Sequence, residues 1–253
     1  DDLRSSEYEI IAPKRKDFDI TNNEMLHEIF NDFKPSICIN TIAFTDVSKS
    51  EIFKDQANLI NNKAVNNLAS ACKKSKTKLV HFSTDYVFNG LKETPYIESD
   101  ATNPLNFYGI SKLRGERSIR ASGCEYLIIR TSWVFSEFRK NFLKTILDLT
   151  KHKKEITVVS DQRGCPTYAK DISQNVLKVL RSPEKIEKLI NSTYHFCGNK
   201  HMSWYEFAKE IFNYAQTVDG RPEVKIAPLL DPYKEKDLII RPKYSVLSPN
   251  KFS

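Results

Sequence analysis

The sequence lacks any apolar run close to the roughly 20 residues that a membrane-spanning helix needs, and it shows no stretch typical of a signal peptide. Its five cysteines are odd in number and include no C-x-x-C pair. That usage argues against a disulfide framework and favours free thiols in a reducing compartment. These absences exclude an integral membrane protein and a disulfide-stapled secreted domain, and they predict a cytoplasmic protein.

The chain also lacks a clustered basic patch. Its formal net charge is +7, but the lysines are scattered and are not gathered with aromatic residues, so we expect no nucleic-acid partner. A basic surface suits an anionic substrate, which it attracts. The run from His195 to Cys197, with His201 nearby, has the residue types of a metal site. Its apolar character is more typical of a buried strand, and we predict no metal ligands there.

The most informative stretch runs from His81 to Lys112. An apolar strand over residues 78–84 ends in Ser83-Thr84-Asp85, and a helix opens near Asn106. Tyr108 and Lys112 are four residues apart, which places both on one helix face with Cβ atoms roughly 5–6 Å apart. An ammonium there would lower the pKa of the tyrosine, and the hydroxyl of Ser83 or Thr84 could complete a site for carbonyl reduction. Taken alone, such a pair is more often a solvated helix face.

Four runs give this pair a context. They read STDYVFNG, TPYIESDATNPLNFYGISKLRGE, RTSWVF and DQRGCPT. In this order they resemble the extended short-chain dehydrogenase/reductase superfamily, and within it the dTDP-4-dehydrorhamnose reductase family. The resemblance extends from about residue 14 to residue 172, and the tail RPKYSVL adds a fainter match. Thr84, Tyr108 and Lys112 match the catalytic positions of that family.

The resemblance implies an α/β fold, a Rossmann-type doubly wound parallel sheet with a smaller C-terminal substrate-binding lobe. The hydrophobic pattern predicts strands over residues 8–12, 36–42, 78–84 and 126–131, and helices over 22–33, 51–74 and from 108 onward. We expect the dinucleotide-binding domain over residues 1–136 and the lobe over 137–253. Elements near 168–181 and 193–198 should pack back on the first domain.

A glycine-rich turn is missing. A dinucleotide-binding fold normally opens with a strand and such a turn, whose N–H groups hold the pyrophosphate. None of the seven glycines lies between a first strand and a first helix. We therefore expect an N-terminally incomplete version of the enzyme, with a cofactor-free relative as the alternative. Because the absent strand would lie in mid-sheet, these 253 residues alone should fold and bind NADPH poorly.

The expected cofactor is NADPH, with NADH as an alternative. The basic run around Arg15 follows the second predicted strand, where a basic group accommodates the 2′-phosphate of NADP; a solvated charge run is the other interpretation. The resemblance places Asp19 and Ile20 beside the adenine, and Ala43 and Thr45 in a turn against the cofactor. It also implies that Tyr108 and Lys112 contact the nicotinamide ribose. Mg²⁺ is implied by resemblance only, with no readable site.

The resemblance likewise implies the substrate side. Val47, Asp85, Tyr86 and Trp133 match family positions that line the sugar pocket. Ligands of open α/β sheets bind outside the carboxyl ends of the strands, so we expect Thr45, Thr84, Asp85 and Trp133 to converge on Tyr108. Trp133 as an ordinary core residue is the alternative.

The function implied is NADPH-dependent reduction of the C4 keto group of a nucleotide-linked 4-keto-6-deoxy sugar. The expected conversion is dTDP-4-dehydrorhamnose to dTDP-rhamnose, for cell-surface polysaccharide precursors. Two alternatives stay open: another nucleotide-sugar epimerase or dehydratase, and a non-catalytic regulatory subunit like that of methionine adenosyltransferase. The partner expected is the nucleotide-sugar substrate, and a homodimer is left open.

Overall fold

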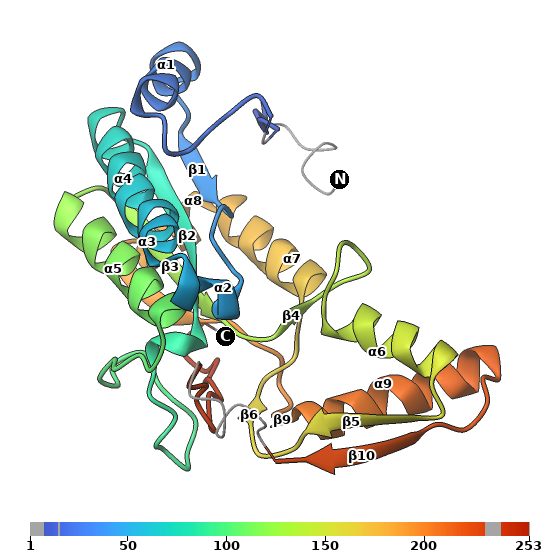
Figure 1. The fold of residues 1–253 in the computed structure, drawn as a ribbon. Helices are drawn as coiled ribbons and strands as arrows, with labels where there is room; N and C mark the ends of the chain where they lie inside the picture. The colour runs from blue at the N-terminus through green and yellow to red at the C-terminus, as the bar shows by residue number, and fades with distance from the viewer. Residues whose placement is uncertain (1–7, 15, 231–238, 253) are drawn as a thin grey trace.

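The structure is a computed structural model that describes residues 8–14, 16–230 and 239–252 (Figure 1). Its helices are α1 (Asn23–Phe33), α2 (Val47–Ile52), α3 (Lys54–Asn58), the π-helix η1 (Leu59–Lys63), α4 (Ala64–Lys74), the 3-10 turn η2 (Asp85–Val87), α5 (Phe107–Ser122), α6 (Phe142–His152), α7 (Ala169–Leu180), α8 (Pro183–Leu189) and α9 (Trp204–Asp219). Its strands are β1 (Ile37–Asn40), β2 (Lys78–Thr84), β3 (Tyr126–Thr131), β4 (Val134–Phe135), β5 (Glu155–Val159), β6 (Arg163–Gly164), β7 (Thr167–Tyr168), β8 (Ser192–His195), β9 (Met202–Ser203) and β10 (Lys225–Leu229).

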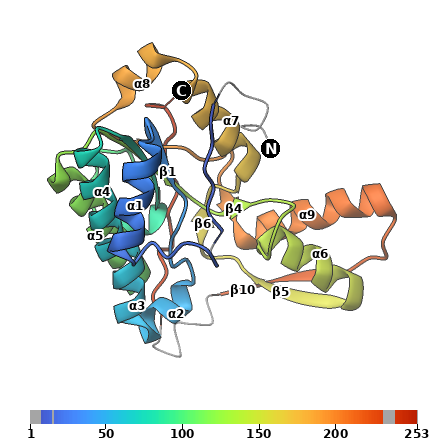
Figure 2. The same cartoon turned by 90° about the horizontal axis from the view of Figure 1, so that it is seen from above.

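The main sheet has four parallel strands in the order β1-β2-β3-β8. Helices α1, α4 and α5 cover one face, and α7 and α8 cover the other (Figures 1 and 2). Parallel strands with helices on both faces make up the doubly wound arrangement. The predicted Rossmann-type fold is confirmed.

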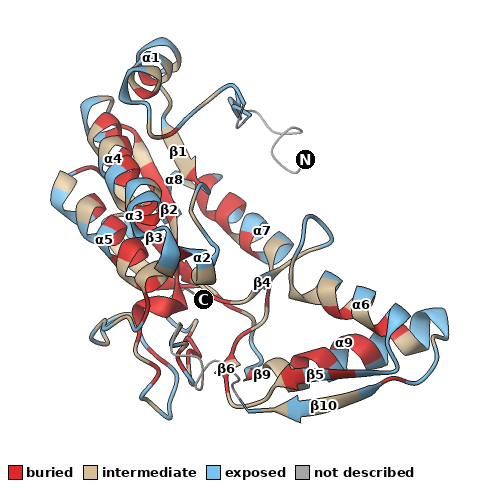
Figure 3. Ribbon diagram, viewed as in Figure 1, coloured by how far each residue is buried: buried red, intermediate tan, exposed pale blue. Residues whose placement is uncertain are grey.

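The middle strands are buried because they carry apolar side chains on both faces, as a parallel sheet requires. On one face, Leu79 and Ile128 pack against α1, α4 and α5. On the other, Val80, Leu127 and Ile129 pack against α7 and α8. Each fully buried aliphatic side chain of this kind contributes about 1.5–3 kcal/mol. Figure 3 shows the buried residues concentrated along these strands and the inner helix faces.

One prediction about the beginning of the sheet is wrong. Residues 8–12 form no strand, and Ile10 and Ile11 are 41% and 50% exposed. Strand-forming residues make a strand only where a neighbouring strand supplies backbone partners, and no described strand lies beside them. β1 lies at the edge of the described sheet and is half-buried over its first three residues.

The single helix predicted over residues 51–74 is also wrong. The segment starts at α2, where Asp46 Oδ1 accepts the Lys49 N–H (2.9 Å). It breaks at Phe53, whose φ of −105° and ψ of 55° are not helical. It then passes through η1, which carries the buried Asn61. No glycine or proline marks these breaks, so the apolar stripe alone suggested one continuous helix.

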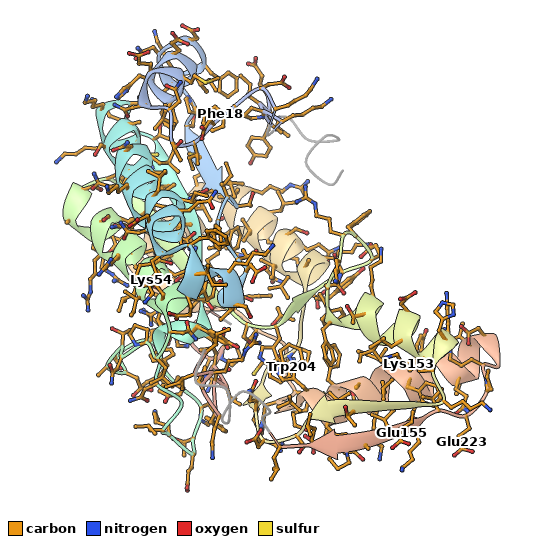
Figure 4. All side chains as sticks on the ribbon, viewed as in Figure 1. Phe18, Lys54, Lys153, Glu155, Trp204 and Glu223 are labelled. Carbon is orange, nitrogen blue, oxygen red and sulfur yellow. The ribbon has the colours of Figure 1, made fainter. Side chains whose placement is uncertain are left out.

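The C-terminal part of the chain adds a second, smaller layer. β5 and β10 pair in parallel and pack against α6 and α9 around an apolar cluster that includes Ile146, Ile156 and Phe207. α9 begins with a capping box between Ser203 and Glu206, which satisfies two free N–H groups of its first turn. In Figure 4 Trp204 lies at the start of α9, at the end of this layer that is nearer the main sheet.

Within the described residues, no helix has both the length and the apolar character to cross a membrane. The same residues include no group of three or more His, Cys, Asp or Glu side chains able to hold a metal ion. His195 lies in β8 and is fully buried, with its Nδ1 beside the Tyr96 carbonyl oxygen (3.1 Å).

Candidate active site

Tyr108 is placed by the packing of the first turn of α5 on η2. Asn106 caps this helix, and its Oδ1 accepts the Gly109 N–H (2.9 Å). A Cβ at Gly109 would lie 2.2 Å from the Tyr86 carbonyl oxygen, so a larger residue would push the helix away from η2. The close approach brings the Tyr86 and Tyr108 rings into edge contact, with centroids 5.9 Å apart.

The hydroxyl beside Tyr108 belongs to Thr84, at the end of β2. The Thr84 hydroxyl forms a hydrogen bond that lowers the pKa of Tyr108, but burial raises it more, to about 12. Ser83, the other candidate, points elsewhere and donates to Glu116 Oε1 (2.6 Å). The structure therefore places the Thr84 hydroxyl beside Tyr108 and directs the Ser83 hydroxyl to Glu116.

Lys112 lies in the same helix but is bonded into the sheet. Its Nζ donates to the Phe82 carbonyl oxygen (2.6 Å) and lies 3.4 Å from His81 Nε2. Burial lowers the pKa of Lys112 to about 8, although Glu116 raises it. The prediction that the pKa of Tyr108 is lowered by this ammonium is wrong. Burial raises the pKa of the phenol, and Lys112 is not among the groups that act on it.

A buried ion pair supports this part of α5, and sequence reasoning missed it. Arg130 of β3 donates from Nε and Nη2 to the two carboxylate oxygens of Glu116 (2.9 and 2.8 Å). Burial raises the pKa of Glu116, but Arg130 and the bond from Ser83 lower it to about 2. The three residues come from three different elements, so no local motif announces them.

Asp85 follows Thr84 and is 3% exposed. Burial raises its pKa to about 7, although hydrogen bonds from Ser245 and Thr84 lower it. Burial also raises the pKa of Tyr86. Two of the predicted sugar-pocket residues therefore lie beside Thr84 and Tyr108.

The loop after β1 carries Ala43 and Thr45, two of the predicted cofactor positions. It is fastened by Asn61, whose Oδ1 accepts the Phe44 N–H (2.8 Å) and whose Nδ2 donates to the Phe44 carbonyl oxygen (3.0 Å). The same amide nitrogen donates to Ser111 Oγ on α5 (2.9 Å). Asn61, not predicted, thus ties this loop to the helix of Tyr108, and Thr45 itself remains exposed.

The remaining cofactor positions are less closely tied to Tyr108. Asp19 Oδ1 accepts the N–H and hydroxyl of Thr21 (2.9 and 2.8 Å). Ile20 is buried in the apolar cluster with α1 and α4. Arg15 lies outside the described residues. Val47, predicted to line the sugar pocket, is the first residue of α2.

Trp133 is held by the lobe rather than by the Tyr108 group. Its indole stacks on Trp204 with ring centroids 3.5 Å apart and planes 6° apart. A Cβ at Gly164 would lie 2.4–2.8 Å from three adjacent ring atoms, so the glycine lies close against the ring. The indole is half-buried between its contacts with Trp204 and Gly164. Its φ of 48° is left-handed, a strained conformation for a residue with a side chain.

The chain is similar in sequence and fold to known proteins. A family model described as "RmlD substrate binding domain" matches residues 1–253. The chain belongs to this family. Relatives include a dTDP-4-dehydrorhamnose reductase of Aggregatibacter actinomycetemcomitans, 39% identical over 82% of this chain and 71% of its own length. Another is the spore coat polysaccharide biosynthesis protein SpsK of Bacillus subtilis, which is 38% identical over 97% of this chain and 82% of its own length.

Solved structures of the family give the same result. A dTDP-4-dehydrorhamnose reductase from Bacillus anthracis in complex with NADP superposes with a TM-score of 0.88 at 36% identity, covering 97% of this chain and 83% of that one. A dTDP-4-dehydrorhamnose reductase from Clostridium acetobutylicum superposes with a TM-score of 0.89 at 38% identity, covering 98% of this chain and 84% of that one. The resemblance to dTDP-4-dehydrorhamnose reductases and the prediction of an oxidoreductase of that type are confirmed.

Proposed function

We propose that this member of the RmlD family reduces the C4 keto group of a nucleotide-linked 4-keto-6-deoxy sugar with NADPH. The proposed substrate is dTDP-4-dehydrorhamnose and the product dTDP-rhamnose, used for surface polysaccharide precursors. The names of the relatives support the substrate, and SpsK supports the polysaccharide context. The observation that carries the proposal is the pairing of the buried Thr84, at the carboxyl end of β2, with the half-buried Tyr108, with Lys112 one turn further along α5.

In this proposal Tyr108 donates a proton to the C4 oxygen. A pKa of about 12 keeps the phenol protonated at neutral pH, which is the form a general acid needs before reaction. Thr84 donates a hydrogen bond to the same oxygen and holds the carbonyl in place. When bound, NADPH supplies the hydride to C4. Lys112 holds the nicotinamide ribose, and its low pKa lets it release or take up a proton.

The residues present fit a dinucleotide and a sugar on this edge of the sheet. The loop of Ala43 and Thr45 is braced from α5 by Asn61, which leaves the exposed Thr45 available to a ligand. Asp85 Oδ2 is buried without a partner in the described part of the chain, as expected for a polar atom reserved for a ligand or a proton. Val47, Tyr86 and Trp133 complete the proposed sugar side.

On the cofactor side, Asp19 and Ile20 are proposed to lie beside the adenine, and Arg15 is proposed to meet the 2′-phosphate. The preference for NADPH over NADH rests on the basic run at residues 14–16 and on the NADP bound to the Bacillus anthracis relative. The boundary after residue 136 and the homodimer stay predictions.

The test is a Tyr108→Phe variant of the natural protein that carries this sequence. With dTDP-4-dehydrorhamnose and NADPH, kcat should fall by about 10²-fold or more, the scale of a lost general acid, while KM changes little because the ring remains. Tyr214→Phe, on the exposed side of α9, is the matched control and should behave like the parent. Near-normal turnover by Tyr108→Phe would remove this residue from the mechanism.

A further inference from the structure

The Thr84 hydroxyl has a single proton to donate. A hydroxyl has one proton to donate and two lone pairs to accept with. Thr84 Oγ1 donates to Asp85 Oδ1 (3.0 Å) and accepts the Tyr86 N–H (3.2 Å), and Tyr108 is its third partner. While Asp85 is a carboxylate, the only proton of Thr84 is therefore committed to Asp85, and none is left for a substrate oxygen.

The surroundings of Asp85 disfavour the carboxylate. Tyr108 faces it from α5, Ser245 from the C-terminal segment, and the thiols of Cys165 and Cys197 from β6–β7 and the end of β8. These groups carry no positive charge at neutral pH. No cation is among the described groups that act on the pKa of Asp85, and Arg241 acts on the neighbouring phenol of Tyr86. A buried carboxylate without a cation is costly.

We propose that Asp85 is a positioning residue that acts in its protonated form, donating to Thr84 Oγ1 and so releasing the Thr84 hydroxyl to the C4 oxygen. This rests on the proposed function. The lone pairs of Thr84 then accept from Tyr86 N and from Asp85, and its proton joins that of Tyr108 at the carbonyl. No bond other than hydrogen bonds changes, and Asp85 keeps its proton through the reaction.

The sign of the pH effect follows. Burial raises the pKa of Asp85 to about 7, so the active, protonated form dominates below that pH and is lost above it. Lys112, with a pKa of about 8, adds a separate step at higher pH. The rise of kcat/KM towards acid should therefore show two steps, of which the lower belongs to Asp85.

Asp85→Asn tests the proposal because the carboxamide has the same shape and a permanent N–H donor for Thr84. We expect this variant to keep at least about a tenth of the parent activity at pH 6, within the range of a repositioned hydrogen bond, and to lose the lower step while the Lys112 step remains. Asp85→Ala, which has no donor, should be at least tenfold slower at every pH. Asp148→Asn, on the exposed side of α6, should keep the parent profile.

A second measurement needs neither substrate nor cofactor. Difference infrared spectra between pH 6 and pH 8 should show the carbonyl band of a buried carboxylic acid that disappears near neutrality, and Asp85→Asn should lack it. If the parent does not reduce the sugar, the proposed function fails and the infrared band still tests the protonation of Asp85. Inactive Asp85→Asn at pH 6, an unchanged two-step profile, or the absence of the band would each overturn the proposal.

Discussion

The sheet around Tyr108 and the contact between sheet and lobe are held together by different forces. Around α5, charged side chains are buried and fixed by directional bonds, as between Glu116 and Arg130. At the lobe the principal contact is a stack of two indoles, Trp133 on Trp204, backed by Phe142. Hydrogen-bonded ions tolerate little displacement, whereas stacked rings can slide at small cost. The first region thus suits groups that must stay in register with a reacting carbonyl, and the second suits an adjustable wall.

The largest effect is expected from breaking the buried ion pair. Arg130→Met leaves Glu116 buried without its main partner, which should cost about 3–5 kcal/mol of unfolding free energy. Arg120, which also bonds Glu116 but whose side chain is 35% exposed, provides the control: Arg120→Met should cost less than about 1 kcal/mol. Urea unfolding at pH 7 measures both. Equal losses would show that burial does not distinguish the two arginines.

An intermediate effect is expected at the indole. In Gly164→Ala the new methyl would lie 2.4 Å from Trp133 Cε2, and such overpacking typically costs about 1–3 kcal/mol. The cost should shrink in a Trp133→Leu background, where the ring is absent. A double-mutant cycle in urea measures this coupling. Additive costs would mean that the glycine is needed for its backbone and not for the space it leaves.

The smallest effect is expected from the exposed ion pair at the same contact. Arg163 Nη1 lies 3.4 Å from Glu206 Oε2, with side chains 42% and 48% exposed. Arg163→Gln should change stability by less than about 1 kcal/mol, and the difference should vanish in about 1 M salt, where the Debye length is near 3 Å. A larger loss of stability, or a loss that does not depend on salt, would show that this ion pair contributes substantially to the stability of the lobe contact.

The sequence was sufficient where a signal is local. Thr84 and Tyr108 could be found because one ends an apolar strand and the other opens a capped helix. The direction of a long side chain is not local: Lys112 has the predicted spacing, yet it bonds the Phe82 carbonyl and does not lower the pKa of Tyr108. Asn61 was missed for a similar reason, since its partner Ser111 is 50 residues away in the sequence.

Two fold predictions failed because they ignored what a segment packs against. Residues 8–12 have strand-forming side chains, but a strand exists only with a neighbour, and the described sheet offers none there. The helix over residues 51–74 has one apolar stripe, but the segment breaks at Phe53, next to a tertiary contact in which Glu51 Oε1 accepts the Phe107 N–H (2.5 Å). Neither the lack of a neighbouring strand nor this hydrogen bond can be read from the periodicity of the sequence.

The stacked indoles also make the protein its own optical reporter. The sequence contains two tryptophans in all, and both are in this stack, 3.5 Å apart. Two identical chromophores in such contact couple their excited states, so the near-ultraviolet circular dichroism should carry a paired signal that neither ring gives alone. Because one ring lies in the connection between β3 and β4 and the other in α9, that signal measures docking of the lobe. Adding a ligand or denaturant would reveal, without any label, whether the lobe moves before the sheet unfolds.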